Sequence, residues 1–536
     1  MPAVTSVQET PHGLQVTFDG RPLYGNRPRD SARHRTDELQ VQSDTLILCF
    51  SPVAWHGIDT LLARLPDDSA IMAIEAEPEL LEIARARMPA TTPERLCLVA
   101  ASSDSVLGQL RKWGITRFRR TVQVSTNAGT LLHRAEYRAL AEAIDQQIRV
   151  AWQNRMTISA MGSLWVRNVI RNCVHQGQPH GLAPIRTPVV VCGAGPSLDA
   201  ALGVVVENRA RLTVIAVDTA APILEQRGVM PDLVVAVEGQ IANLYDFLPV
   251  SNRDYLLVAD MVSCPSAVEQ HPRVAWILSE FADLSFLSRL HALRSIQFGV
   301  APLGSVGVVA VAVALHLARS MVFTAGLDFA YCAGRTHARG APAGFSALAR
   351  TSRLAPLNDA AFAVRGMPAD STGTWRTTLP MVSYAEDLRG IAADDTARSG
   401  MVRLRAIEPS GLDGGYPGVA AAEAGRLITA PPESLKSPPG SDDSRERVEG
   451  SREEIQVFVR SEIEALDGLS ELLSRPDVRR AGRPLSEALA YCDYVYFDFP
   501  DAPGPDDRSE SFMNRVRIRT DYYRSRWAMA LTLLRS

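Results

Sequence analysis

The sequence has no cysteine pattern that would define a disulfide framework or a zinc site. Its seven cysteines are widely spaced, odd in number and include no C-x-x-C pair, the spacing that such sites use. We therefore expect a reducing compartment. The first residues, MPAVTSVQET, lack the basic segment and the apolar core of a signal peptide, so we expect the cytoplasm.

The chain also lacks an excess of positive charge and an uninterrupted membrane-length span. Its formal net charge is −4, which excludes binding to nucleic acid or to an anionic membrane by bulk attraction. One long apolar stretch, Gly299–Ala318, is interrupted by a proline, a glycine, a serine and a histidine, which favours a buried helix of an α/β core. We expect neither nucleic acid nor a membrane as a partner.

Familiar phosphate and metal motifs are missing as well, namely G-x-G-x-x-G, the Walker A loop and D-x-D. In their place, the apolar run from Pro188 breaks at GAGPS, residues 193–197. Glycines let a backbone pass close to a ligand, and the amides of a following helix would face an anion. A phosphate site and a plain strand-to-helix turn fit these residues equally well.

Length and patterning predict several α/β domains. We expect a β-rich lead-in and a Rossmann-like domain over 1–125, and connecting helices over 126–185. Glu75 ends a predicted strand where a nucleotide-binding fold places an acid, but the turn Ser51–Gly57 lacks the glycines of a cofactor site. We therefore favour a structural or partner-binding role for this first domain.

The central region, 186–430, is predicted to be a doubly wound, mostly parallel sheet with an insertion at 340–430. Residues 431–450 have the composition of a linker, and 451–536 are predicted to be helical. The strand candidates are Val189–Cys192, Thr213–Val217, Leu233–Val237, Tyr255–Ala259, Ala275–Ser279 and Met321–Ala325.

Polar residues follow four of these strands. They are Gly193–Ser197, Asp218 with Thr219, Glu238 and Asp328. Because ligands of such sheets bind beyond the carboxyl ends of the strands, we expect these residues to line one crevice. Asp218 can equally serve as the N-cap of the next helix.

Five motifs in order carry a family resemblance. They are GAGPSLD at 193–199, VDTA at 217–220, Pro231-Asp232 before a strand, LGSVG at 303–307 and GLDFAYCAGRTHARG at 326–340. With a long helix ending in Trp165, Asn168 and Asn172, they resemble the motility accessory factor (Maf) family, the MptE-like flagellin glycosyltransferases. The resemblance covers nearly the whole chain.

A more distant likeness is to bacterial lipo-oligosaccharide sialyltransferases, where similar segments bind the CMP part of CMP-sialic acid. It implies that Asp328 closes the pocket and that His337 is the candidate general base, although the sialyltransferase histidine lies farther beyond the aspartate. We place Glu238 beside the implied donor-binding residues, which are Gly193, Gly195, Pro196 and Ser197 for the phosphate, Asp218 and Thr219 by the nucleotide or sugar, and Gly304 and Ser305 at the next helix start.

The function implied is transfer of a nonulosonic acid, of sialic, pseudaminic or legionaminic type, from CMP to Ser/Thr of flagellin. Amides can stabilise its monophosphate leaving group, so neither a metal nor another cofactor is expected. The partner would be flagellin, and a homo-oligomer is left open. Two alternatives remain: a diphosphotransferase like the archaeal 6-hydroxymethylpterin diphosphokinases, using ATP and Mg²⁺, or a non-catalytic flagellar assembly factor.

Overall fold

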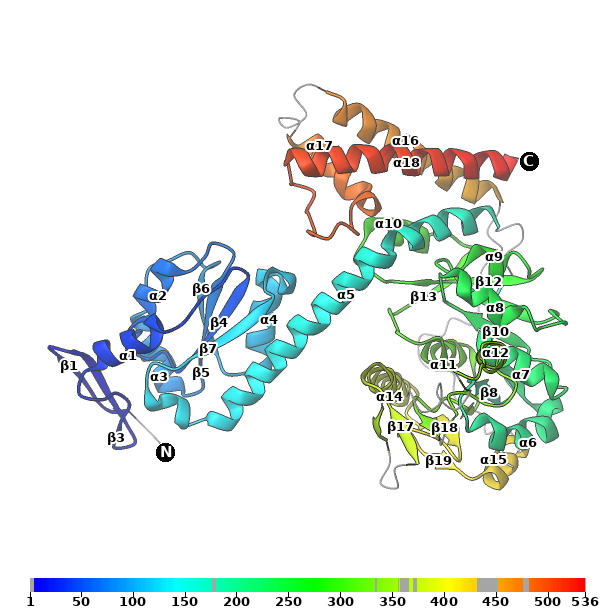
Figure 1. Cartoon of the computed structure of the whole chain (residues 1–536), viewed down its shortest axis with the longest axis horizontal. Helices are drawn as coiled ribbons and strands as arrows, with labels where there is room; N and C mark the ends of the chain where they lie inside the picture. Colours follow the sequence, from blue (N-terminus) through cyan, green and yellow to red (C-terminus); the bar gives the residue numbers. More distant parts are fainter. Residues whose placement is uncertain are drawn as a thin grey trace. The chain divides into compact units, whose positions relative to one another are not determined.

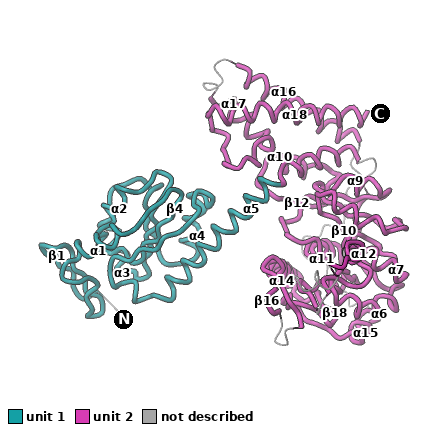
Figure 2. The backbone as a smooth tube through the Cα atoms, viewed as in Figure 1, with its two compact units in different colours: residues 1–160 teal, residues 161–536 magenta. Residues whose placement is uncertain are grey.

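The computed structural model describes residues 4–175, 180–332, 335–354, 356, 366–369, 374–430, 452–475 and 482–535. The chain divides into two compact units, residues 1–160 and residues 161–536 (Figure 2). The division falls within a single long helix, α5 (Arg134–Val174), which begins in the first unit and ends in the second. The predicted linker 431–450 lies outside the described residues.

The first unit is a parallel four-stranded sheet preceded by a small antiparallel one. The small sheet holds β1 (Val4–Thr10), β2 (Gly13–Phe18) and β3 (Arg21–Pro22). The order of the parallel sheet is β6-β5-β4-β7, from β4 (Thr45–Phe50), β5 (Ala70–Glu75), β6 (Leu96–Ala100) and β7 (Arg120–Val124). Helices α1 (Pro28–Asp37), α2 (Ile58–Arg64), α3 (Pro78–Ala86), α4 (Ser103–Trp113) and the first part of α5 complete the unit (Figure 1).

The carboxyl end of β4 is occupied by the unit's own side chains. Asn127 Nδ2 donates to the Ser51 carbonyl at 2.6 Å, and a Cβ at Gly129 would lie 2.2 Å from Ser51 Oγ. Glu75 accepts from the Ala76 amide at 3.0 Å and from the Tyr137 hydroxyl at 3.1 Å. These contacts use the groups that a bound nucleotide would need, and they support a structural role for this unit.

The second unit is built on a nine-stranded parallel sheet in the order β13-β12-β11-β10-β9-β8-β14-β18-β19. The predicted α/β class with a doubly wound sheet is confirmed. Three strands were not predicted from the sequence. They are β13 (Ile296–Val300), β18 (Leu404–Ile407) and β19 (Gly418–Val419). The predicted ones appear as β8 (Val189–Cys192), β9 (Thr213–Val217), β10 (Leu233–Ala236), β11 (Leu256–Asp260), β12 (Val274–Ser279) and β14 (Val322–Ala325).

Helices connect and cover this sheet. They are α6 (Leu198–Asn208), α7 (Ala221–Gln226), α8 (Leu244–Phe247), α9 (Pro265–Val268), α10 (Ser285–His291), α11 (Val306–Leu317), α12 (Pro342–Ala349), α14 (Leu379–Ser399) and α15 (Ala421–Thr429). The stretch Gly299–Ala318 ends β13 and forms α11, whose residues are almost all buried, as predicted. Among the described residues, no helix is long and apolar enough to cross a membrane. A small sheet of β15 (Tyr331–Cys332), β17 (Trp375–Thr377) and β16 (Met367–Pro368) connects the segment after β14 with the insertion.

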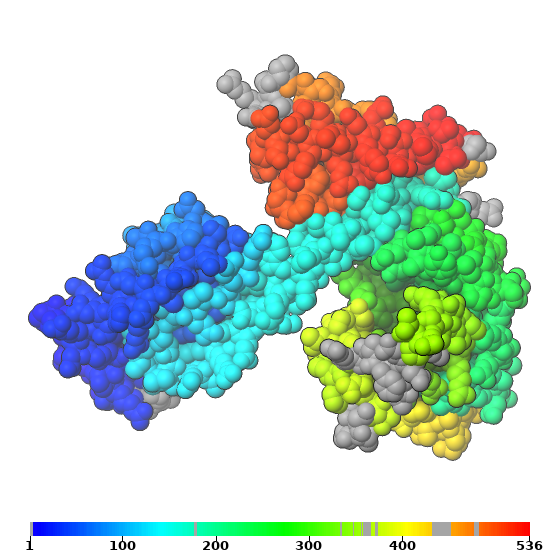
Figure 3. All heavy atoms as spheres, viewed as in Figure 1, coloured from blue at the N-terminus to red at the C-terminus, as the bar shows by residue number. Residues whose placement is uncertain are grey.

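The C-terminal helices are α16 (Arg452–Leu473), α17 (Gly482–Tyr491) and α18 (Glu510–Arg535). They pack against the last turns of α5 and against α10 (Figure 3). The guanidinium of Arg289 on α10 forms a bidentate ion pair with the Glu462 carboxylate, with N–O distances of 2.8 and 3.1 Å. Its central carbon lies 3.6 Å from the ring centre of Tyr491. The aromatic side chains that follow α17, namely Tyr494, Tyr496, Phe497 and Phe499, are buried, whereas Tyr491 at its end is exposed.

Candidate functional site

The sheet of the second unit changes direction between β8 and β14. From β8 the chain moves strand by strand to β13, and α11 then carries it back to β14 on the other side of β8. The loops that follow β8 and β14 therefore diverge at one point. In open parallel sheets this switch point is where ligands bind.

The glycines of these two loops bring the backbones into direct contact. The Gly193 amide donates to the Ala325 carbonyl and the Gly195 amide to the Gly326 carbonyl, both at 2.8 Å. A Cβ at Gly193 would lie 2.4 Å from the Gly326 oxygen. The sequence suggested that the backbone of this loop passes close to a ligand. In the structure, the backbone passes close to the loop after β14.

Asp328 accepts two hydrogen bonds from Ser197, the residue that precedes α6. Its carboxylate accepts from the Ser197 amide at 2.8 Å and from the Ser197 hydroxyl at 2.5 Å. A third bond, from the Gly411 amide at 3.2 Å, connects it to the loop between β18 and β19. Burial raises the pKa of Asp328. These contacts make Asp328 a residue that positions α6, and in this structure they occupy both Ser197 donors.

His337 lies beside the loop that follows β8. The Ala338 amide donates to the Ala194 carbonyl at 2.8 Å, and Arg335 pairs with Asp199 of α6 at 2.7 Å. The imidazole is half-buried, and its Nδ1 lies 3.0 Å from the Thr336 hydroxyl. Burial lowers the pKa of His337, so the ring is neutral near pH 7 and able to accept a proton.

Asp218 and Thr219 belong to a second polar group, at the end of β9. Asp218 accepts from the Thr219 amide at 2.8 Å and from Asn243 Nδ2 at 2.5 Å. Burial raises the pKa of Asp218; burial and then the Asp218 charge raise that of Asp246 to about 7. Glu238, at the end of β10, is exposed and accepts from the Gln240 amide at 2.9 Å. Since β8 and β9 are neighbours, this group lies one strand from the loop of Gly193.

Gly304 and Ser305 begin α11. The Ser305 side chain caps the helix by accepting from the Gly307 amide at 3.2 Å. A Cβ at Gly304 would lie 2.3 Å from the ring of Tyr384 on α14. This glycine therefore permits close contact between the helix start and the insertion. The described residues include no group of three or more His, Cys, Asp or Glu side chains placed to hold a metal ion.

Two asparagines on α5 clamp the ends of neighbouring strands. Asn168 Nδ2 donates to the carbonyls of Gly239 and Val262 at 2.9 and 2.8 Å. Asn172 Nδ2 donates to those of Met261 and Ser263, both at 2.9 Å. The two asparagines that contribute to the family resemblance therefore have a structural role, which is to hold α5 against these strand ends.

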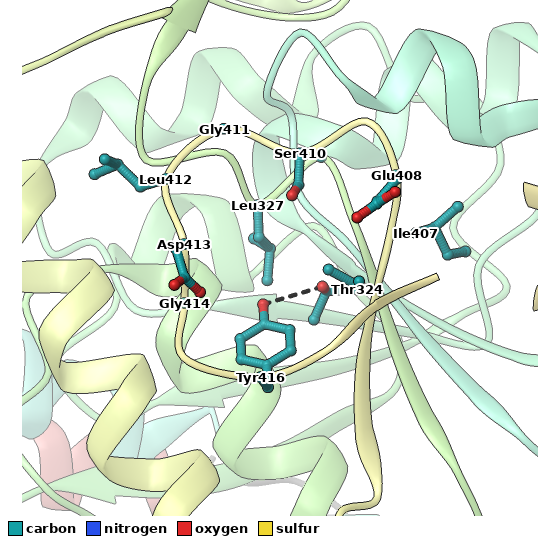
Figure 4. Close-up of a pocket in the computed structure, with 13 residues that line it drawn as sticks. Thr324, Leu327, Ile407, Glu408, Ser410, Gly411, Leu412, Asp413, Gly414 and Tyr416 are labelled. Carbon is teal, nitrogen blue, oxygen red and sulfur yellow. Dashed lines mark hydrogen bonds between the residues drawn. The ribbon is translucent and has the colours of Figure 1, made fainter. Parts of the chain in front are cut away.

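Sequence reasoning missed several residues of this region. Asp246 lies in the one-turn helix α8 and Asn243 in the short turn just before it, and neither belongs to a motif. The Asn243 Oδ1 atom is buried without a hydrogen-bond partner among the described residues. Tyr416 and Thr324, whose hydroxyls lie 3.1 Å apart, help to line a cavity of about 210 Å³ (Figure 4). The loop that lines it, residues 408–417, is rich in glycine and contains none of the motifs named above.

We predict that Gly195→Ala destabilises the protein, because the added Cβ would lie 2.4 Å from Asp328 Oδ2 and 2.7 Å from the Gly326 oxygen. The free energy of unfolding, measured in urea, should fall by about 1–3 kcal/mol. Gly203→Ala is the matched control on α6, where nothing lies within 4 Å, and it should gain about 0.5–1 kcal/mol. Equal shifts in the two variants would contradict the packing described.

We predict a pH-dependent effect of Asp246→Asn. With a folded pKa of about 7 against an ordinary 3.8, the folded state holds a proton that the unfolded chain has already lost. Stability from this group is therefore present at low pH and is lost as pH rises from about 4 to 7. The Tm of the wild type, followed by calorimetry, should fall relative to that of Asp246→Asn across this window. The exposed control, Asp254→Asn, should run parallel to the wild type.

Comparison with known proteins agrees with this geometry. The family model of the 6-hydroxymethylpterin diphosphokinase MptE-like proteins matches residues 168–334, the part that contains β8 to β14. Two uncharacterised proteins of Treponema pallidum (strain Nichols) are similar to this chain. One is 30% identical over 349 residues, covering 62% of this chain and 60% of the relative. The other is 28% identical over 116 residues, covering 20% and 55%. The chain thus spans little more than half the length of these curated relatives.

Among solved structures, a Maf glycosyltransferase from Magnetospirillum magneticum AMB-1 aligns with all of this chain and with 90% of its own. The TM-score is 0.55 and the sequence identity is 15%, a likeness of fold. The resemblance predicted from the motifs is thus confirmed: residues 168–334 match the MptE-like family model, and the chain is similar in fold to a Maf glycosyltransferase.

Proposed function

We propose that the chain is a glycosyltransferase that moves a nonulosonic acid from a CMP-activated donor to Ser/Thr hydroxyls of flagellin in the cytoplasm. The observation that carries the proposal is the extent of the structural likeness. The Maf glycosyltransferase fold covers 100% of the chain, including the first unit and the C-terminal helices. The segment that matches the family model, residues 168–334, includes neither the first unit nor the C-terminal helices.

The chemistry of the switch point fits such a transfer. The acceptor oxygen would form a bond to the anomeric carbon of the sugar while the bond from that carbon to the phosphate oxygen breaks. CMP leaves with the electron pair. Amides at the start of α11, which Ser305 caps, are groups that can stabilise its phosphate charge.

His337 is the proposed base that takes the proton of the acceptor hydroxyl. It is neutral near pH 7 because burial lowers its pKa, and its segment is bonded to the loop after β8. Asp328 is proposed to position that loop, because the N-terminus of α6 and the Gly411 amide both donate to it. Asp218 and Thr219 are proposed to lie by the nucleotide or sugar, and the exposed Glu238 beside them.

A second candidate is a diphosphotransferase, which is favoured by the match of residues 168–334 to the MptE-like family model. Such an enzyme would bind ATP with Mg²⁺. The two candidates therefore differ in nucleotide and in metal dependence.

We predict that CMP raises the Tm of the purified full chain without Mg²⁺, and that calorimetry detects its binding. ATP and UDP serve as matched probes, each with and without Mg²⁺. Selective, metal-independent CMP binding supports the glycosyltransferase. Binding of ATP that depends on Mg²⁺, without CMP binding, would replace it by the diphosphotransferase.

His337→Ala should retain CMP binding and lose transfer to flagellin by about 10²–10⁴-fold, the usual contribution of a general base. The exposed His34→Ala is the control. Because the pKa of His337 is lowered, the wild-type rate should persist to lower pH than an ordinary histidine base allows. Transfer by His337→Ala at the wild-type rate would exclude this role.

A further inference from the structure

A cavity of about 210 Å³ lies beyond the carboxyl ends of β14 and β18 (Figure 4). The loop between β18 and β19 forms one wall, and the end of β14 forms the floor. The side chains that define it are Thr324, Leu327, Glu408, Ser410, Asp413 and Tyr416. Gly326 and Leu327 of the motif at 326–340 line it, but none of the residues individually assigned above to donor binding does.

The wall of this cavity is fixed at both ends and in the middle. Pairing of β18 with β19 closes the loop, and the Gly411 and Leu412 amides donate to the carboxylate and the carbonyl of Asp328 at 3.2 and 2.8 Å. A Cβ at Gly414 would lie 2.4 Å from the Tyr416 ring. The cavity is therefore held open by backbone contacts.

Charge and hydrogen-bonding groups limit what the cavity can take. Its lining includes two carboxylates and three hydroxyls, and no Lys, Arg or His. Among the described residues no hydrogen-bond donor contacts the Glu408 carboxylate, and the only such bond to Asp413 is from the Gly415 amide at 2.7 Å. Both carboxylates are exposed, and outside the lining the Arg389 guanidinium donates to the Asp413 carbonyl at 2.9 Å. The carboxylates disfavour an anionic group in the cavity, whereas the hydroxyl groups of a ligand would find acceptors on them.

Size restricts the ligand further. The cavity has a volume of about 210 Å³ and is partly open to solvent, so its size limits the part of a ligand that enters it and not the whole ligand. A single ammonium group would leave most of it empty. A six-membered sugar ring fits, and each carboxylate can accept from a pair of adjacent hydroxyls.

We propose that this cavity, lined by Glu408, Asp413, Ser410, Tyr416 and Thr324, is a binding site for a neutral, hydroxyl-rich sugar ring. This goes beyond the proposed function, because the donor sugar there is an anion and its acceptor is a protein side chain. Asp328 joins the cavity wall to the loop after β8, so the neutral sugar lies next to the switch point.

The test is saturation-transfer NMR on the full chain. The neutral probes are galactose and N-acetylglucosamine, and the others are N-acetylneuraminic acid and Nα-acetyl-lysine. We expect a neutral sugar to bind, and the Glu408→Gln/Asp413→Asn variant to bind it about tenfold more weakly. Exposed Glu423→Gln on α15 is the control and should not change binding. Tyr416→Phe, which removes one hydroxyl, should also weaken it.

Three results would overturn the proposal. These are no neutral-sugar signal, equal binding by the double variant, or binding of Nα-acetyl-lysine alone in a manner that the double variant abolishes. CMP titration of the unmodified chain separates this site from the proposed function. If that chain binds CMP and gives no neutral-sugar signal, the cavity proposal fails alone; if it binds the sugar and does not bind CMP, the donor proposal fails alone.

Discussion

The geometry of the candidate site depends on the buried carboxylate of Asp328. A carboxylate that is 2% exposed costs free energy unless hydrogen bonds compensate. Here the Ser197 amide and hydroxyl and the Gly411 amide supply three bonds, and the dipole of α6 favours a negative charge at this end. The loops after β8, β14 and β18 therefore meet at one side chain. Moving it would disturb all three loops.

Much of the fold could be predicted because buried parallel strands read as continuous apolar runs. Val189–Cys192 and Thr213–Val217 were predicted with the bounds that the structure gives. β13 was missed for the same reason, since its residues merge with the apolar run that becomes α11. β19 has two residues and follows a glycine-rich loop, so no periodic pattern could reveal it.

The candidate site was only partly predictable. A glycine in the sequence can indicate that there is no room for a side chain, but it does not identify the neighbouring group that fills the space. At Gly193 the neighbour is the Gly326 carbonyl, and at Gly304 it is Tyr384, far along the chain. Asn243 and Asp246 gave no signal, since a one-turn helix has no periodicity. Their contact with Asp218 arises only from the tertiary fold. The assigned roles of the predicted site residues remain predictions.

The pairing of Arg289 with Glu462 has a consequence for how the chain can be divided. Glu462 is fully buried, and its partner belongs to α10, well inside the region that matches the MptE-like family model. A fragment ending after β14 would lose Glu462 and would expose Phe286 of α10, whose ring packs against Tyr494 and Trp527 of the C-terminal helices. The segment that matches the family model is therefore smaller than the packed unit to which α10 belongs.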